Sequence, residues 1–105
     1  MCFDNINAGV LVIDDNLLNI AAIQGVLTEF DVSSQKAVSG KDALRLIESR
    51  ANSYQTDKIP MFALILLDFS MPDMDGPEVF IKFRQFLTDR GFEMPYVCCC
   101  SAYTE

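Results

Sequence analysis

The stretch VLVIDDN, residues 10–16, decides the fold of this 105-residue chain. Its first four residues are all apolar and mostly β-branched, which predicts a strand buried on both faces of a parallel sheet. The apolar run stops at Asp14 and Asp15, and Asn16 is a residue type that often caps the first turn of a helix. We therefore expect a central strand that leads directly into a helix, with two carboxylates at the junction.

Strand and helix patterns alternate along the rest of the chain. Apolar residues at helical spacing from Ile20 to Phe30 predict a first helix of about 13 residues. A second apolar run, residues 62–67, predicts another central strand, which ends at Asp68. The remaining expected elements are a polar strand from about 31 to 38, a helix from about 43 to 50, loops over 51–60 and 69–76, a helix between Pro77 and Gly91, and a strand over 95–100. This β-α-β-α-β-α-β order predicts an α/β fold, a parallel sheet covered by helices.

The bulk composition limits what this chain can be. Hydrophobic residues make up 50% of it and the mean hydropathy is +0.20, which favours one packed domain over residues 1–105 rather than disorder. The formal charge of −7 argues against a nucleic-acid partner, because phosphate-backbone binders need a basic surface. No apolar run approaches the roughly 20 residues of a membrane span, and the N-terminus lacks a basic segment followed by an apolar one. We therefore expect no membrane insertion and a cytoplasmic location.

Histidine and cysteine set further limits. The chain contains no histidine, so histidine-based catalytic triads, HExxH zinc sites and an internal phosphohistidine are excluded. The cysteines are Cys2 and the run from Cys98 to Cys100, and no CxxC pair is present for zinc. We interpret the three adjacent cysteines as small buried residues of a strand, with a redox role as the alternative.

Acidic or hydroxyl side chains follow three of the four expected strands. Asp14 and Asp15 follow the first strand, Asp68 ends the third, and Ser101 follows the fourth. In open parallel sheets, ligands bind beyond the carboxyl ends of the strands. If the first and third strands are neighbours, three carboxylates meet there, and like charges so close repel unless a cation neutralises them. Carboxylate oxygens suit Mg²⁺, so the sequence predicts a magnesium site at this edge.

Several segments resemble the response-regulator receiver domain family. VLVIDDN at 10–16, followed by Asn19, is similar to the family's first strand and acid pair. LILLDFSMPDMDG at 64–76 resembles its phosphoacceptor strand and Met-Pro-x-Met-Asp-Gly loop. AVSGKDAL at 37–44 is similar to the exit from its second strand, and Ser101-Ala102 matches its hydroxyl-small pair. These matches occur in the family's order, and together they are specific.

The resemblance implies both a fold and a reaction. The fold is a doubly wound, flavodoxin- or CheY-like sandwich with strand order 2-1-3-4. Asp68 would accept a phosphoryl group from a phosphohistidine on a histidine kinase or a His-phosphotransfer protein. Asp14, Asp15, Asp68 and the backbone carbonyl of Ser70 would hold the Mg²⁺ cofactor, in keeping with the needs of phosphoryl transfer.

The same resemblance assigns supporting roles around Asp68. Ser101 would donate a hydrogen bond to the phosphoryl group and draw its loop inward as a switch. Tyr103 would tune the access of hydrolytic water, and Met71 is a second residue expected to modulate the site. Asp73 and Asp75 are interpreted as solvated loop acids.

One departure from the family affects the expected function. Receivers carry a lysine at the end of a fifth strand, an aromatic switch residue and a final helix, and no segment of these 105 residues matches them. We therefore expect a C-terminally truncated receiver whose fourth strand is an exposed, cysteine-lined edge that a neighbouring chain could cover. The alternative function is a receiver-like fold kept as a structural or assembly subunit with a vestigial site.

Two other kinds of site fit the acidic loop poorly. An EF-hand loop that contained Asp73 and Asp75 would end at Lys82, where a bidentate acid is required. A haloacid-dehalogenase-like phosphatase places its Asp-x-Asp pair directly after an apolar strand. Here that pair comes five residues after Asp68, and Pro77 stands where a hydroxyl residue is expected.

Overall fold

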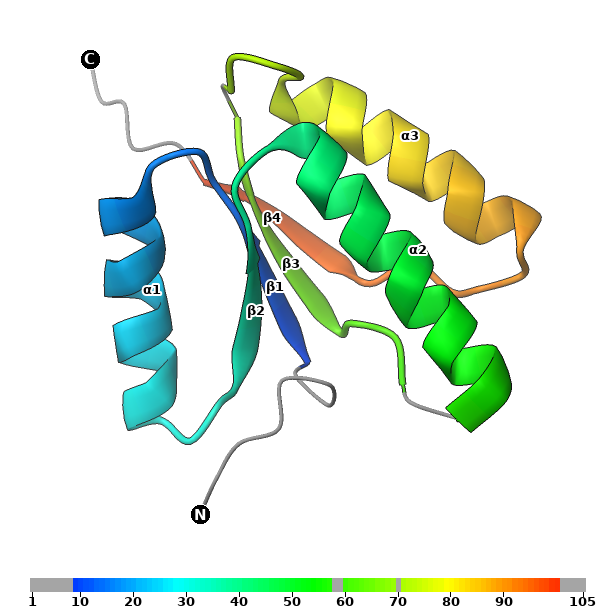
Figure 1. Ribbon diagram of the computed structural model, residues 1–105, viewed down its shortest axis with the longest axis horizontal. Helices are drawn as coiled ribbons and strands as arrows, with labels where there is room; N and C mark the ends of the chain where they lie inside the picture. The colour runs from blue at the N-terminus through cyan, green and yellow to red at the C-terminus, as the bar shows by residue number, and fades with distance from the viewer. Residues whose placement is uncertain (1–8, 58–59, 70, 101–105) are drawn as a thin grey trace.

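A computed structural model describes residues 9–57, 60–69 and 71–100, which form four strands and three helices in alternation (Figure 1). The elements are β1 (Val10–Ile13), α1 (Leu17–Glu29), β2 (Ser34–Ala37), α2 (Gly40–Asp57), β3 (Leu64–Asp68), α3 (Gly76–Asp89) and β4 (Tyr96–Cys100). All strand pairs are parallel, and the sheet order is β2-β1-β3-β4. The predicted α/β fold and strand order are therefore confirmed. Within these residues, no helix has the length and apolar character needed to cross a membrane.

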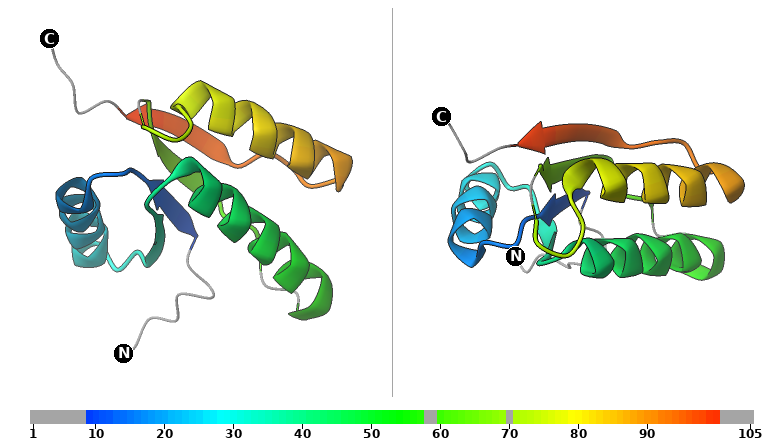
Figure 2. Two further views of the ribbon diagram at one scale, coloured as in Figure 1. Left: turned by 45° about the horizontal axis from the view of Figure 1, so that its top comes forward. Right: turned by 90° about the horizontal axis from the view of Figure 1, so that it is seen from above.

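The helices cover the two faces of the sheet unequally. α1 packs on one face, where Ile20 meets Val10 and Val12 in a small apolar cluster. α2 and α3 pack on the other face over a larger cluster, to which β1 contributes Leu11 and α3 contributes Phe83. Figures 1 and 2 show α1 alone on its side of the sheet and the other two helices side by side. Successive residues of β1 thus pack against different helices, as expected of a strand buried on both faces.

Helix α2 is longer than the sequence predicted. The segment 51–60 was expected to be a loop, yet α2 continues to Asp57. Ala51 is fully buried, and the ring of Tyr54 lies edge-on to that of Phe92 with 5.5 Å between the ring centroids. Ala51 and Tyr54 lie three residues apart, on the side of the helix that faces the protein. Of the two polar residues between them, Asn52 is exposed and Ser53 is half-buried, and this polar composition explains why the segment resembled a loop.

Strand β3 begins later than predicted because Phe62 packs against an arginine instead of entering the sheet. The ladder starts at Leu64, and the guanidinium carbon of Arg50 lies 3.9 Å from the centroid of the buried Phe62 ring. Arg50 Nη1 also donates a hydrogen bond to the carbonyl oxygen of Pro60 at 2.9 Å. Burial lowers the pKa of this guanidinium, which still stays charged. Arg50 therefore ties α2 to the segment that enters β3. Strand β2 likewise begins later than expected, at Ser34.

Strand β4 forms one edge of the sheet in the described part of the chain, where it pairs with β3 alone. The side chain of Tyr96 is 84% exposed, and Cys98 and Cys99 are also exposed. The prediction that these cysteines are buried is therefore wrong, because the face and edge they occupy have no covering helix among the described residues. Among the described residues, β4 is thus an exposed edge lined by Cys98 and Cys99, as the sequence predicted.

Candidate functional site

The three aspartates predicted to converge do lie together at the carboxyl edge of the sheet. Ile13 of β1 is paired with Leu67 of β3, so the residues that follow each of them leave the sheet side by side. One carboxylate oxygen from each of Asp14, Asp15 and Asp68 lies within 4.8 Å of the others. The parallel register of two neighbouring strands thus produces a cluster of three like charges.

Asp14 is the most buried of the three acids, and its carboxylate is held by two hydrogen bonds. Its side chain is only 7% exposed, and its backbone N–H donates to the carbonyl oxygen of Ala37 on β2 at 3.0 Å. Its Oδ1 accepts a hydrogen bond from the Asn16 N–H at 2.9 Å, and its Oδ2 accepts one from Asn19 Nδ2 at 3.4 Å. These contacts fix the direction of the carboxylate before any ligand binds.

The start of α1 is organised by the same two asparagines. Asn16 is the N-cap, as the sequence predicted, and its Oδ1 accepts from the N–H groups of Leu18 at 2.9 Å and Asn19 at 3.3 Å. Asn16 therefore serves both the helix and Asp14, since its side chain caps α1 while its backbone N–H binds the carboxylate. This double role connects the position of α1 to the geometry of the acid cluster.

The graded exposure of the three acids fits a hard divalent cation. Asp14 is buried, Asp68 is half-buried and Asp15 is exposed. Such a site offers carboxylate oxygens from one side and leaves the other side open to water, which suits Mg²⁺ because this ion usually keeps several water ligands. A cation there would also relieve the repulsion among the three carboxylates. The donor set therefore fits the predicted cofactor.

Three of the other predicted site residues, Ser70, Ser101 and Tyr103, lie outside the described residues. Their roles stay predictions. Met71 is described, and its side chain is 7% exposed and belongs to the core cluster between the sheet and helices α2 and α3. Its packing is thus defined, whereas its modulating role stays a prediction.

Asp73 and Asp75 are exposed, as predicted, but both make structural contacts that the sequence analysis did not assign. Asp75 is the N-cap of α3, where its Oδ1 accepts from the Glu78 N–H at 3.0 Å. Asp73 binds the start of α2 instead, with Oδ1 accepting from Gly40 N–H and Oδ2 from Lys41 N–H, both at 3.1 Å. An Asp just before Gly-Pro is a recognisable helix-start signal. No comparable local signal exists for Asp73.

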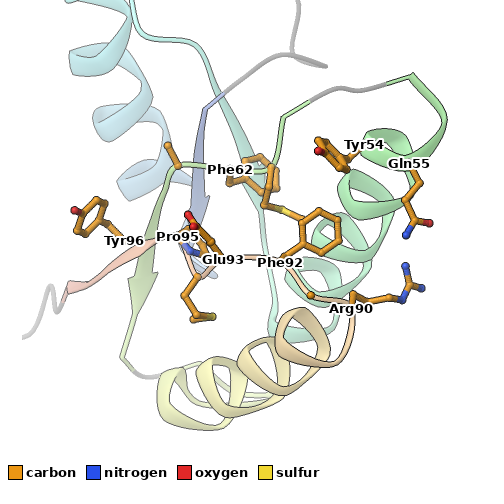
Figure 3. A pocket seen from close by; sticks show the side chains of 12 residues that line it. Tyr54, Gln55, Phe62, Arg90, Phe92, Glu93, Pro95 and Tyr96 are labelled. Atoms are coloured by element: carbon orange, nitrogen blue, oxygen red, sulfur yellow. The ribbon is translucent and has the colours of Figure 1, made fainter.

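A hollow in the described surface lies at the opposite end of the molecule from the acid cluster. Its volume is about 560 Å³, and it lies where α2 and α3 end and β3 and β4 begin. Figure 3 shows the rings of Tyr54, Phe62 and Phe92 grouped on one side of it and that of Tyr96 on the other. None of the three clustered aspartates lines this hollow, whose walls mix aromatic, aliphatic and polar side chains. It is therefore separate from the acid site.

Known proteins resemble this chain over most of its length. The response regulator receiver domain family matches residues 10–104. Histidine kinase CKI1 of Arabidopsis thaliana is 36% identical over 93 residues, which cover 84% of this chain but only 8% of the kinase. The chain thus corresponds to a small part of that relative.

Solved structures share the fold. The receiver domain of the same kinase, in complex with Mg²⁺ and BeF₃⁻, superposes with a TM-score of 0.76 at 33% identity, over 91% of this chain and 66% of that one. The Ssk1 receiver domain, in co-crystals with the Saccharomyces cerevisiae histidine phosphotransfer protein Ypd1, gives a TM-score of 0.67 at 23% identity, covering 88% of this chain and 60% of that one. The second likeness shows the fold alone. With its residues 10–104 matched, this chain belongs to the response regulator receiver domain family.

Proposed function

We propose that this receiver domain accepts a phosphoryl group on Asp68 from a phosphohistidine of a partner protein, with Mg²⁺ as cofactor. The observation that carries this proposal is the cluster of Asp14, Asp15 and Asp68, whose carboxylate oxygens lie within 4.8 Å of one another at the edge where parallel sheets bind ligands. Phosphoryl transfer depends mainly on positioning and charge neutralisation, and this cluster offers both.

Asp68 is assigned the nucleophile because it ends a central strand and is half-buried beside the other two acids. One of its carboxylate oxygens forms the new bond to phosphorus as the bond from phosphorus to the partner's imidazole nitrogen breaks. The imidazole leaves with that electron pair and takes up a proton, and the product is an acyl phosphate. Asp14 and Asp15 hold the cation, whose positive charge balances the incoming phosphoryl oxygens.

Two residues outside the described ranges complete the proposed site. The Ser70 carbonyl supplies a further metal ligand, and the Ser101 hydroxyl donates a hydrogen bond to the phosphoryl oxygens. Both assignments rest on the resemblance to receivers and on their sequence positions after β3 and β4. Tyr103 and Met71 belong to the proposal as residues that modulate the site.

Helix α1 supplies a docking surface for the phosphohistidine partner. The helix begins at Leu17, three residues after Asp14, and has no charged residue before Glu29. Leu17 is 61% exposed and Leu18 is 81% exposed. Exposed apolar groups gathered beside a reactive site favour a protein partner over a small molecule. A histidine phosphotransfer protein, as bound to the Ssk1 receiver, or a histidine kinase is the proposed partner. The cytoplasmic location inferred from the sequence belongs to this same proposal.

The decisive experiment measures the acceptor residue directly. The chain is treated with Mg²⁺ and acetyl phosphate, and intact-mass spectrometry follows the addition of one phosphoryl group, which hydroxylamine should remove. Asp68→Asn should abolish the adduct. Asp75→Asn removes a carboxylate from the same edge of the molecule and should retain it. Absence of any Mg²⁺-dependent adduct in the wild-type chain, together with no beryllofluoride binding, would contradict the proposal and favour a fold kept for assembly.

A further inference from the structure

The connection between β3 and α3 is held at its base against the proposed phosphoacceptor. The Gly76 N–H donates to the carbonyl oxygen of Phe69 at 2.8 Å, which closes the connection at the foot of α3. A Cβ atom on Gly76 would lie 2.7 Å from the carbonyl oxygen of Asp68. The start of α3 therefore packs directly against the backbone of Asp68. The two ends of the β3–α3 connection lie next to each other as a result.

The far end of this connection is held by Asp73, whose hydrogen bonds reach a different helix. Its two carboxylate oxygens accept one hydrogen bond each from the N–H groups of Gly40 and Lys41, the first two residues of α2. These partners are 33 and 32 residues away in the sequence. Asp75, only two residues further on, caps its own helix. Asp73 alone of these two acids therefore links the connection to another element.

The chemistry of the Asp73 contact makes it a firm one despite its exposure. A carboxylate that accepts from two N–H groups at a helix N-terminus gains from charge-assisted hydrogen bonds and from the helix dipole. Next to it, Met74 fits against Gly40, where a Cβ atom would approach the Met74 Cβ to 2.7 Å. Met71 is buried in the core. The connection is thus fixed at Met71, Asp73 and Met74 on one side of Asp68.

We propose that Asp73 is a positioning residue for phosphoryl acceptance, because it holds the segment that follows Asp68 in the conformation that the metal and the phosphoryl group require. This inference rests on the proposed function, in which Asp68, at the start of this segment, is the phosphoacceptor and a metal ligand. Asp73 does not touch the reacting atoms. It acts through the connection, whose tip it attaches to the rigid start of α2.

The expected size of the effect follows from population arithmetic. If losing Asp73 lets the connection sample other conformations, so that the competent one is populated about one fifth of the time, apparent affinity for Mg²⁺ and for beryllofluoride falls about five-fold. A residue that only stabilised α2 would leave both affinities unchanged under conditions where the protein stays folded. The two roles are therefore separable.

The chain offers two matched controls for this test. Ser39→Ala removes the other side chain that caps α2, whose Oγ accepts from the Asp42 N–H at 3.0 Å, and leaves the connection untouched. Asp75→Asn removes one negative charge from the same connection and leaves the link to α2 intact. Ser39→Ala therefore shows the effect of weaker capping of α2 alone, and Asp75→Asn shows the effect of losing one negative charge alone.

The experiment measures Mg²⁺ binding by isothermal titration calorimetry and the rate of modification by acetyl phosphate, for wild type, Asp73→Ala, Asp73→Asn and both controls. Asp73→Ala should weaken Mg²⁺ binding and slow modification about five-fold. Asp73→Asn keeps one oxygen acceptor, so its Mg²⁺ affinity and its rate of modification should lie between those of Asp73→Ala and the wild type. Both controls should stay within about two-fold of wild type. Amide exchange at Gly40 and Lys41 should accelerate in Asp73→Ala.

The possible outcomes separate this inference from the proposed function. Wild-type affinity in Asp73→Ala, or an equal loss in Ser39→Ala, would overturn the positioning role while Asp68 remains the acceptor. A wild-type chain that binds Mg²⁺ but takes no phosphoryl group would sink the proposed function and, with it, a role of Asp73 in phosphoryl acceptance. The Mg²⁺ affinities of the variants would then still decide whether Asp73 positions the metal site. A wild-type chain that binds neither would overturn both.

Discussion

Gly40, at the start of α2, packs against Met74 in the connection between β3 and α3, and no space is left for a side chain on the glycine. A Cβ atom added to Gly40 would lie 2.7 Å from Met74 Cβ and 2.9 Å from Val79 Cγ2. Gly40 is the first residue of α2, and Met74 precedes α3. The starts of these two helices are therefore packed together directly beside the acid edge of the sheet.

Gly40→Ala should destabilise the protein by about 1–3 kcal/mol, because the new methyl group overpacks a closed contact. Gly25→Ala is the matched control: Gly25 is an exposed residue inside α1, and a Cβ atom there would meet nothing within 4 Å. The free energy of unfolding of that variant should rise by up to about 1 kcal/mol, because alanine has a higher helix propensity than glycine. Urea unfolding of the three proteins measures both effects. A Gly40→Ala variant as stable as wild type would show that Met74 and Val79 move aside readily.

The contrast between these contacts and the acid cluster explains what the sequence could predict. Asp14 and Asp15 follow a buried strand, and Asp68 ends another, so local patterns and the rules for parallel sheets were enough to bring them together. The contact of Asp73 with Gly40 joins residues 33 positions apart, and neither has a local pattern that names its partner. Long-range capping of this kind depends on how two connections pack and is not encoded by periodicity.

Helix α2 shows a second limit of local patterns. Its last two turns carry many polar residues, and only Ala51 and Tyr54 mark the packed side. Two such residues are too few to give a helical pattern, so the polar composition of the segment predicted a loop. Tertiary packing against Phe92 overrides the weak local preference, which is the usual reason that helix ends are misplaced.

Asp15→Asn should affect stability in opposite directions with and without Mg²⁺. Without the ion, the variant should melt at or above the wild-type temperature, because one of three clustered like charges is gone. At a Mg²⁺ concentration ten times the dissociation constant, the ion should raise the free energy of unfolding of the wild type by about 1.4 kcal/mol. It should raise that of the variant much less. Thermal melts at neutral pH with and without Mg²⁺ test this.

The control for the metal prediction is Asp89→Asn, at the end of α3 and outside the acid cluster. This variant changes the net charge by the same amount as Asp15→Asn, and Mg²⁺ should stabilise it as much as it stabilises the wild type. Equal gains in the wild type and Asp15→Asn would exclude Asp15 as a metal ligand.

Leu18→Lys should slow phosphoryl transfer from a partner protein and leave modification by acetyl phosphate unchanged. Leu18 is 81% exposed on α1, so a lysine there costs little folding energy but places a charge in the proposed docking surface. Loss of one apolar anchor at an interface typically costs about 1–2 kcal/mol, or roughly five- to thirty-fold in affinity. Transfer assays with a phosphorylated histidine phosphotransfer protein measure this.

An exposed residue far from the docking surface gives the comparison for Leu18. Ile81→Lys places the same charge on α3, where Ile81 is 57% exposed, and should leave transfer at the wild-type rate. If both variants slow transfer equally, the effect comes from net charge and α1 is not the docking surface.

The stability that Asp73 contributes should depend on pH. Its hydrogen bonds, first of all that from the Gly40 N–H, hold the pKa of its carboxyl below the ordinary value of 3.8. A group whose pKa is lowered in the folded state stabilises the protein above its unfolded-state pKa, and this contribution disappears as pH falls through the folded-state pKa. The unfolding midpoint of Asp73→Asn should therefore lie below that of wild type at pH 6, and the gap should narrow below about pH 4. Asp73→Ser, which also cannot titrate, should show the same narrowing. Urea unfolding between pH 2.5 and 7 measures it, and a gap that stays constant over this range would show that the ionised carboxylate of Asp73 gives the fold no advantage over a neutral acceptor.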